Sequence, residues 1–301
     1  MPKTAYIIEA DYATYAAAIS RTGIATPAAQ LFTYNGATFI ALSRELNAFP
    51  HTNKFAATVY RTLDGISFTR YDGPAGYDGN GVCQDGNTLW FVLLNELPVP
   101  PYEVPFKLVS FDLDTLTFGS ISVDGPLTTG NSGSLSLSAL DGTVTVFYAQ
   151  LDPDTLDRIL FSSSGAGETI IDPLMAIPAL VRSGSDAVGG VVVFYNGRSP
   201  FEYRAKGGII GSASIGEAEF NVGDVSVTTP PLYIPETNEW VMPTIEFLTG
   251  ILTMLVAGPG TMAREDIRTP AGDELYSQPL IRRNGANITV YYLVHPDGDL
   301  N

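Results

Sequence analysis

The chain has 301 residues, of which 45% are hydrophobic and 16% are charged, so it is able to bury a large core. Its formal net charge is −16 and its pI is about 4.3, and a surface of this charge argues against a general nucleic-acid-binding role. A single cysteine, Cys83, excludes an intrachain disulfide and a metal-thiolate site.

The N-terminal stretch MPKTAYIIEADY lacks the continuous apolar run of about 7–15 residues that a secretory signal needs. No stretch approaches the roughly 18 apolar residues of a membrane span. We therefore expect a protein made in the cytoplasm, without a secretion signal and without membrane insertion. The following residues, AYIIEADYATYAAAI, predict two short strands around Asp11-Tyr12 that no complete hairpin precedes.

Further along the chain, alternating apolar and polar residues flank Asn-Gly or Asp-Gly pairs. The clearest case is LSLSALDGTVTVFYAQ, from Leu135 to Gln150, around Asp141-Gly142. Such pairs tolerate the positive φ angles of a type I′ turn, so the pattern predicts a β-hairpin. It recurs at Asn35-Gly36, Asp85-Gly86 and Asn284-Gly285, with looser copies near Asp186 and Glu236. The turns are spaced by about 50, 56, 45, 50 and 48 residues, the period of a four-stranded propeller blade.

Each period holds a second pair of strands after the hairpin. In the first unit, FAATVYRT and ISFTRYD follow a loop that contains Pro50 and His51, and the unit ends in YDGP. Later units repeat this plan, but the sixth stops after two strands. The two N-terminal strands would complete its blade and close the ring. The expected blades are 28–74, 81–126, 134–173, 179–220, 230–270, and 278–301 together with 4–20.

By repeat length and hairpin layout, the chain resembles the β-propeller family. We expect a single all-β domain, 1–301, folded as a six-bladed propeller of four-stranded antiparallel blades. The segment Thr62-Leu63-Asp64-Gly65-Ile66-Ser67-Phe68 resembles the Asp-box of sialidase-like propellers, a Ser-x-Asp-x-Gly-x-Thr-Trp turn. It is one residue short, has Thr for Ser and Phe for Trp, and no other unit repeats it clearly. In that family the box is a structural turn that lies away from the active site. The alternative interpretation of this segment is an ordinary Asp-Gly turn between two strands.

The predicted innermost strands lack the residues that glycosidases and sialidases use for catalysis. Glycoside hydrolysis needs two carboxylates, which propeller enzymes supply from these strands. The predicted strands are 29–34, 82–84, 135–140, 180–183, 231–234 and 279–282, and none contains Asp or Glu. The sialidase family uses three arginines, a Tyr nucleophile and a Glu, whereas these strands contribute only Arg182 and Arg282. We therefore expect no catalytic residues.

We also expect no cofactor and no metal site. Asp152, Asp154 and Asp157 lie close together in the sequence but lack the Gly and the closing Glu of an EF-hand loop, so a polar loop is expected there. The sequence contains two histidines, His51 and His295, but no Gly-x-Ser-x-Gly motif, and this argues against a nucleophilic triad.

Binding is expected on the connections between second and third strands, because these are longer and more variable than the hairpin turns. The candidate residues are His51, Pro98, Pro100, Pro101, Tyr102, Asp152, Asp154, Arg198 and Phe201. Acidic propellers without catalytic residues resemble components of phage virions, especially tails and fibres. This implies a structural or host-recognition protein of a virion, made in a host cytoplasm, with other virion proteins and a host-surface glycan as partners. The alternatives are a carbohydrate-active propeller, either lectin or hydrolase, and a bacterial interaction scaffold.

Overall fold

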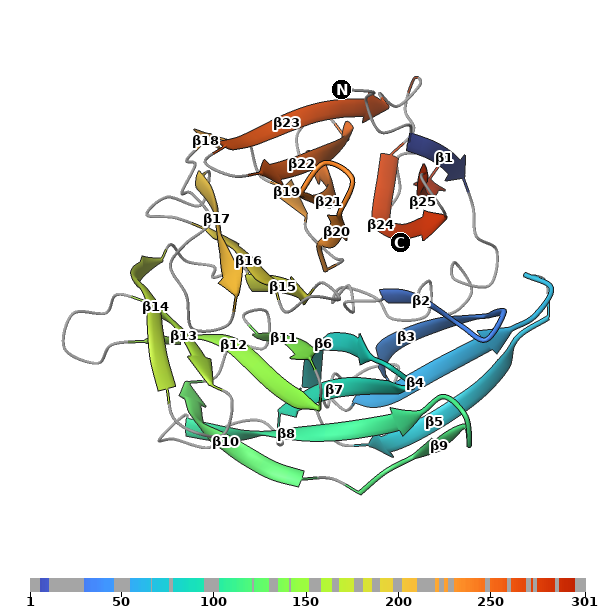
Figure 1. Ribbon diagram of the computed structural model, residues 1–301, viewed down its shortest axis with the longest axis vertical. Helices are drawn as coiled ribbons and strands as arrows, with labels where there is room; N and C mark the ends of the chain where they lie inside the picture. Colours follow the sequence, from blue (N-terminus) through green and yellow to red (C-terminus); the bar gives the residue numbers. More distant parts are fainter. Residues whose placement is uncertain are drawn as a thin grey trace.

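The computed structural model contains β-strands that form six separate sheets (Figure 1). It describes residues 6–10, 30–45, 55–65, 67–75, 78–94, 103–120, 122–129, 135–140, 142–151, 158–163, 168–175, 181–185, 190–196, 202–209, 220–221, 225–226, 230–246, 250–258, 261–268, 272, 275–284 and 287–295. All regular elements within these ranges are strands, which confirms the predicted all-β class. Nowhere in these ranges is there a helix long and apolar enough to cross a membrane.

We number the sheets in chain order. Sheet 1 contains β2 (Gln30–Tyr34), β3 (Ala37–Glu45), β4 (Phe55–Thr62) and β5 (Thr69–Ala75). Sheet 2 contains β6 (Asp78–Asp85), β7 (Thr88–Leu94), β8 (Glu103–Asp112), β9 (Thr117–Phe118) and β10 (Ser122–Thr129). Sheet 3 contains β11 (Leu135–Leu140), β12 (Thr143–Leu151), β13 (Arg158–Ser163) and β14 (Glu168–Met175).

Sheet 4 contains β15 (Val181–Ser185), β16 (Gly190–Asn196), β17 (Glu202–Ile209) and β18 (Phe220–Asn221). Sheet 5 contains β19 (Val225–Ser226), β20 (Leu232–Ile234), β21 (Glu239–Glu246), β22 (Leu252–Gly258) and β23 (Thr261–Arg268). Sheet 6 contains β24 (Leu275–Asn284), β25 (Asn287–His295) and β1 (Tyr6–Ala10).

The predicted hairpins are present and pair antiparallel. In sheet 1, β2 and β3 join through Asn35 and Gly36, whose φ angles of 45° and 75° are both positive, as a type I′ turn requires. Gly86 and Gly142 also have positive φ in the corresponding turns of sheets 2 and 3. The Asn-Gly and Asp-Gly signals therefore placed these turns correctly.

The first strand of sheet 5 is divided, which the sequence pattern did not predict. β19 pairs with one end of β21, with Val225 opposite Glu246, and β20 pairs with the other end, with Leu232 opposite Val241. The buried residues Pro230 and Pro231 precede β20. Proline has no N–H to donate to a strand ladder, so the two prolines account for the interruption.

The fourth strands of sheets 1, 2 and 3 each carry an irregularity at a proline. In sheet 1 the register shifts between Thr58, opposite Asp72, and Ala56, opposite Ala75, so that Gly73 and Pro74 of β5 together face the single residue Ala57 of β4. Corresponding shifts occur between Val123 and Leu127 in β10, and between Asp172 and Met175 in β14. The repeated Asp-Gly-Pro or Asp-Pro endings noticed in the sequence are therefore β-bulges.

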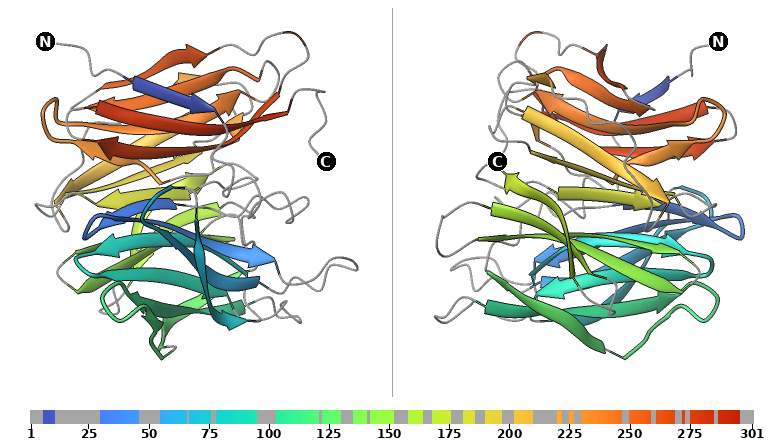
Figure 2. Two further views of the ribbon diagram at one scale, coloured as in Figure 1. Left: turned by 90° about the vertical axis from the view of Figure 1, so that its right-hand side faces the viewer. Right: turned by 60° about the vertical axis from the view of Figure 1, so that its left-hand side comes forward.

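The N-terminal strand pairs with the C-terminal hairpin, as expected, but in the parallel direction. Tyr6 lies opposite Ile288 and Ala10 opposite Tyr292. The dark blue β1 lies among the red C-terminal strands in both side views (Figure 2). An antiparallel blade had been predicted, but no tight turn links β1 to β25, so no hairpin dictates its direction. The second predicted N-terminal strand lies outside the described residues.

Six strands lie nearest the centre of the molecule: β2, β6, β11, β15, β20 and β24 (Figure 1). They contain most of the residues that were predicted to form innermost strands. Each contacts the next in this order, and β24 in turn contacts β2. The sheets are thus arranged about a common centre, with β5, β10, β14 and β23 on the outside (Figure 1).

Apolar side chains fill the spaces between neighbouring sheets. Phe39 of sheet 1 packs in one cluster with Phe91 and Phe111 of sheet 2. On the other face of sheet 1, Leu31 shares a cluster with Leu280 of sheet 6. Further clusters join sheets 2 and 3 and sheets 5 and 6. Because burying apolar surface is the main stabilising contribution to folding, these interfaces hold the sheets together.

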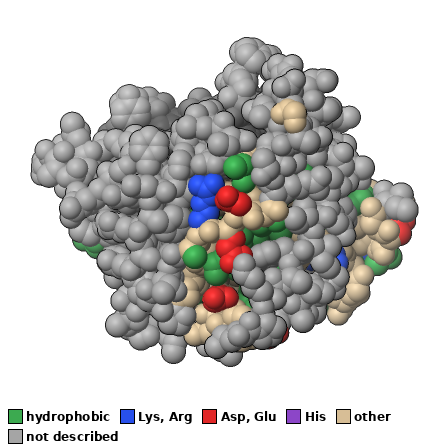
Figure 3. All heavy atoms as spheres, turned by 90° about the horizontal axis from the view of Figure 1, so that it is seen from above, with side chains coloured by type: hydrophobic (Ala, Val, Ile, Leu, Met, Phe, Trp, Pro, Cys, Tyr) green, Lys and Arg blue, Asp and Glu red, His purple; other side chains and the backbone are tan. Residues whose placement is uncertain are grey.

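The outer strand of sheet 5 carries charged side chains of both signs. Arg264 Nη2 lies 3.2 Å from Asp266 Oδ1 within β23. Figure 3, which views the molecule from the side of β23, shows positive and negative side chains next to one another. Charges on an outer strand discourage other strands from pairing with it.

Candidate functional site

The predicted binding residues lie in connections between second and third strands. β3 ends at Glu45 and β4 begins at Phe55, so His51 falls between them, and the other candidates fall between β7 and β8, β12 and β13, and β16 and β17. Because these strands are antiparallel, the connections leave each sheet at the end opposite its first hairpin turn. We call this end the loop face and the opposite end the turn face. His51, Pro98, Pro100, Pro101, Tyr102, Asp152, Asp154, Arg198 and Phe201 themselves lie outside the described residues.

On the turn face, the carboxylate of Asp114 joins sheets 1 and 2. The hydroxyl of Tyr34, at the end of β2, donates to Asp114 Oδ1 at 2.8 Å. The side-chain amide of Asn87 donates to Asp114 Oδ2 at 2.9 Å. Both carboxylate oxygens therefore accept hydrogen bonds, one from each sheet.

The two flanking interfaces have similar bonds. The backbone N–H of Gly142, in the turn of sheet 3, donates to Asp85 Oδ2 of sheet 2 at 2.5 Å. Arg282 Nη1 of sheet 6 donates to Thr38 Oγ1 of sheet 1 at 3.2 Å. Sheets 6, 1, 2 and 3 are thus linked in succession by side chains near their hairpin turns. These polar residues have structural partners, which favours the loop face as the binding surface.

The Asp-box-like segment forms a compact turn between β4 and β5. The hydroxyl of Thr62 donates to Asp64 Oδ1 at 3.0 Å and accepts from the N–H of Gly65 at 2.9 Å. Asp64 Oδ1 also accepts from the N–H of Ser67 at 2.8 Å. Gly65 has a φ of 74°, which a residue with a side chain rarely adopts. Phe68 packs against the cluster between sheets 1 and 6.

A related turn joins β8 to β9 in sheet 2. The segment from Asp112 to Phe118, DLDTLTF, aligns with TLDGISF. Asp112 Oδ1 accepts from the N–H groups of Asp114 and Thr115 at 2.9 and 2.7 Å. Phe118 packs against the cluster between sheets 1 and 2. Leu-Asp and the final Phe keep their spacing, but Asp replaces Thr, Thr replaces Gly, and the positive φ lies at Leu116 instead of the position of Gly65, so this turn is not a clear repeat of the box.

The innermost strand of sheet 2 is longer than predicted and contains carboxylates. β6 runs from Asp78 to Asp85, whereas only residues 82–84 had been assigned to it. The statement that the innermost strands lack Asp and Glu therefore needs correction. Asp85 accepts a hydrogen bond from the turn of sheet 3 and is not paired with a second carboxylate there. The two-carboxylate arrangement of a glycosidase is absent from the innermost-strand side chains that the structure describes.

Arg282 is the predicted innermost-strand arginine whose side chain the structure describes. It lies on β24, is half-buried, and donates to Thr38 of the next sheet. Arg182 lies on β15, opposite Phe194 of β16. The two arginines are therefore on strands of different sheets, and a cluster of three is not seen among the described side chains.

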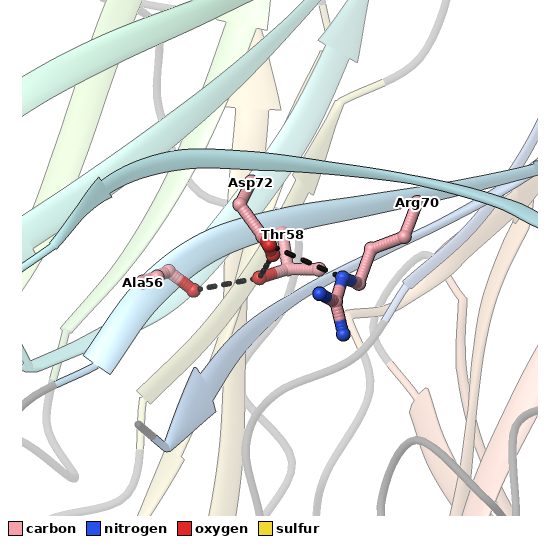
Figure 4. Close-up of polar contacts among 4 residues, drawn as sticks. All are labelled: Ala56, Thr58, Arg70 and Asp72. Atoms are coloured by element: carbon pink, nitrogen blue, oxygen red, sulfur yellow. Dashed lines mark hydrogen bonds and ion pairs between the residues drawn. The ribbon is translucent and has the colours of Figure 1, made fainter. Parts of the chain in front are cut away.

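A further polar cluster links the two outer strands of sheet 1 (Figure 4). The buried hydroxyl of Thr58 donates to the carbonyl of Ala56 at 3.2 Å or to Asp72 Oδ1 at 3.3 Å. Arg70 Nε lies 3.1 Å from Asp72 Oδ2. The cluster satisfies a buried hydroxyl beside the bulge at Gly73 and Pro74, and this is a structural role.

Among the described residues, three groups have pKa values shifted by their surroundings. The hydrogen bond to Asp114 raises the pKa of Tyr34, and the backbone N–H of Thr115 lowers the pKa of Asp112. Burial raises the pKa of the Cys83 thiol well above its usual value. A buried neutral thiol is a poor nucleophile. Among the described residues, no group of three or more His, Cys, Asp or Glu side chains could hold a metal ion.

No protein-family model matches the sequence, and no curated protein matches it. Among solved structures, the chain is similar to a sialidase from Trypanosoma rangeli in complex with the inhibitor DANA, with a TM-score of 0.59 and 11% identity over 90% of this chain and 53% of the sialidase. The same sialidase with 2,3-difluorosialic acid gives a TM-score of 0.59, 11% identity and coverages of 90% and 52%. A β-1,2-mannobiose phosphorylase from Listeria innocua gives 0.44, with 13% identity over 80% of this chain and 89% of that protein.

The chain spans about half the length of the sialidase structures that it resembles. At 11% identity, the likeness concerns the fold alone. The chain is all-β, built of sheets of three to five strands that are antiparallel except for the pairing of β1 with β25, and similar in fold to sialidase-like propellers. The virion role stays a prediction.

Proposed function

We propose that this chain is a glycan-binding β-propeller of six blades that binds through its loop face and does not hydrolyse its ligand. The observation that carries the proposal is the contrast between the two faces. Sheets 6, 1, 2 and 3 are linked on the turn face by Arg282, Asp114 and Asp85, whereas the long, variable connections leave from the opposite end. Variable loops on a rigid scaffold are the usual carriers of binding.

Ring closure is supported by contacts between the first and last sheets. The innermost strands contact one another in succession from β2 to β24 and back to β2. The cluster shared by Leu31, Ile40 and Leu280 fills the space between sheets 1 and 6 with apolar side chains. β1, from the start of the chain, pairs with β25 in sheet 6. In a propeller, the closed ring of sheets leaves only short, protected strand edges.

A neutral glycan is the ligand class that the loop residues suit. The candidate loops combine aromatic rings, Tyr102 and Phe201, with the carboxylates of Asp152 and Asp154. Aromatic rings pack against the C–H faces of sugars, and carboxylates accept hydrogen bonds from sugar hydroxyls. The net charge of −16 disfavours a strongly anionic ligand. The sialidase-like fold agrees with a carbohydrate ligand in general, but DANA and 2,3-difluorosialic acid, which the similar structures hold, are anionic, so the neutral class rests on the charge of this chain and on its loop residues.

The described side chains of the innermost strands support binding without hydrolysis. A glycosidase places one carboxyl as acid and a second as base or nucleophile on either side of the scissile bond. On the described parts of these strands, Asp85 is held by the turn of sheet 3, and Arg282 donates to Thr38. The host-recognition role expected from the sequence is compatible with this proposal, because a host-surface glycan would be its ligand.

A glycan array probed with the labelled full-length chain tests the proposal, together with a hydrolysis panel of fluorogenic glycosides. We expect selective binding to one group of neutral glycans and no turnover. Tyr102→Ala and Phe201→Ala should each weaken binding by roughly tenfold or more, as for aromatic anchors. The matched control is Asn87→Ala on the turn face, which should bind like the wild type. Glycoside turnover, or binding that depends on Asn87 instead, would overturn the proposal.

A further inference from the structure

The interface between sheets 3 and 4 differs from the other described interfaces. In sheet 3, directly opposite residues of β11 and β12 share a face: Leu137 lies opposite Val146, and Ser138 lies opposite Thr145. Leu137 and Val146 belong to the apolar cluster with sheet 2. Ser138 and Thr145 are therefore on the other face of sheet 3, the one directed away from sheet 2.

That other face lies toward sheet 4. Both β11 and β12 contact β15, the first strand of sheet 4. The face is hydroxyl-rich, because Ser136 also lies on it, opposite Phe147. The contacting strand β15 reads VRSGS, so it too is made largely of small and polar residues. By contrast, the interfaces of sheet 1 with its two neighbours are formed by apolar clusters.

Two hydroxyls on this face are buried without a hydrogen-bond partner. Ser138 is 1% exposed and Thr145 is 6% exposed. Ser138 Oγ and Thr145 Oγ1 make no hydrogen bond with any protein group. In the unfolded chain each hydroxyl bonds to water, so burying both unsatisfied would be costly. Buried polar groups of this kind are normally satisfied by an ordered internal water.

We propose that Ser138 and Thr145 together bind one ordered water molecule within the interface between sheets 3 and 4. Cβ atoms of directly opposite residues in an antiparallel pair are about 4.5–5.5 Å apart, and two hydroxyls at this spacing both reach a single water. The water donates a hydrogen bond to one hydroxyl oxygen and accepts one from the other hydroxyl, or donates to both, so both buried hydroxyls are satisfied. This site is separate from the loop face and does not depend on glycan binding.

The first test is a crystal structure of the wild-type chain at a resolution that shows ordered water. We expect a water within about 3.2 Å of both Ser138 Oγ and Thr145 Oγ1. Thr244 and Thr253 provide an internal control, because these buried hydroxyls on β21 and β22 bond directly at 2.5 Å and should hold no water between them. A direct bond between Ser138 and Thr145, or an empty space, would contradict the proposal.

The second test is thermal unfolding of Ser138→Ala, Thr145→Val and the double variant. Each single change leaves the water with one partner fewer, so each should lower Tm by about 1–3 °C. The double variant releases the water and should lower Tm by clearly less than the sum of the two. The double variant's crystal structure should lack the water. Additive effects, or a higher Tm in either single variant, would show that no bridging water links the two hydroxyls.

Discussion

The ring of Phe118 occupies the space that a side chain on Gly73 would need. A Cβ atom built on Gly73 would lie 2.7 Å from Cε1 of Phe118. Gly73 belongs to the bulge of β5 in sheet 1, and Phe118 ends the box-like turn of sheet 2. Phe118 also packs edge-on against Phe111, with the ring centroids 4.8 Å apart. The glycine thus allows an aromatic residue of one sheet to enter the interface with the next.

This contact makes a test of the interface possible. Gly73→Ala should destabilise the protein by about 1–3 kcal/mol, because an added methyl group overpacks a filled site. Chemical denaturation measures the change. In a Phe118→Leu background the same substitution should cost less, because the smaller side chain leaves room. If the two effects simply add, the clash is not with Phe118.

Alkaline pH should weaken the bond between sheets 1 and 2. Asp114 raises the pKa of Tyr34 above its ordinary value of 10.0, so the folded state holds the phenolic proton more tightly than the unfolded state. The resulting stabilisation is complete below the unfolded pKa and is lost as pH rises through the folded pKa. Stability measured by urea unfolding from pH 8 upward should therefore fall more steeply in the wild type than in Tyr34→Phe. Asp114→Asn removes the charge and should also flatten the profile; parallel curves for all three proteins would refute the assignment.

Cys83 should be unreactive in the folded protein. It is buried among Val92, Leu137 and Tyr148, and burial raises the pKa of its thiol. Only the thiolate reacts readily with disulfide reagents. We expect no release of thionitrobenzoate from Ellman's reagent under native conditions and one equivalent in denaturant. Rapid labelling of the native protein would mean that the interface between sheets 2 and 3 opens easily.

The pairing of β1 with β25 should contribute to the stability of the whole fold. Successive N–H groups of a strand point in opposite directions, so one of Ile7→Pro and Ile8→Pro removes a donor that faces β25. At least one of these variants should lose about 1 kcal/mol or more of stability, in a single unfolding transition. Ile8→Val, which suits a strand, is the control. Wild-type stability in both proline variants would show that β1 is not needed.

The sequence predicted those parts of the fold that depend on short-range chemistry. Asn35-Gly36 and Asp141-Gly142 mark turns because their residues tolerate positive φ, and the flanking alternation fixes which strands pair. The all-β class and the strand order of sheets 1, 3 and 4 follow directly. The positive φ of Leu116, at 58°, has no such local signal, because leucine rarely adopts it. The turn of sheet 2 therefore differs in its backbone from the box-like turn of sheet 1, where Gly65 has the positive φ.

The polar bonds between sheets were beyond prediction from a single sequence. Tyr34 and Asp114 are separated by 80 positions, and Arg282 and Thr38 by 244, so no local pattern relates them. The direction of β1 was equally unpredictable, since no turn connects it to its partner. The candidate binding residues of the loop face, such as His51 and Tyr102, remain predictions because they lie outside the described residues.

The bulges of β5, β10 and β14 restrict how copies of this protein can associate. A neighbouring chain extends a sheet only along a regular row of free N–H and C=O groups. Pro74, Pro126 and Pro173 each lack an N–H donor for such a row. The register shifts beside them bend the strands and make the row irregular. Fibril growth by strand addition is therefore obstructed along the perimeter of sheets 1 to 3. Copies that meet side by side at these three edges should therefore not merge their sheets into one.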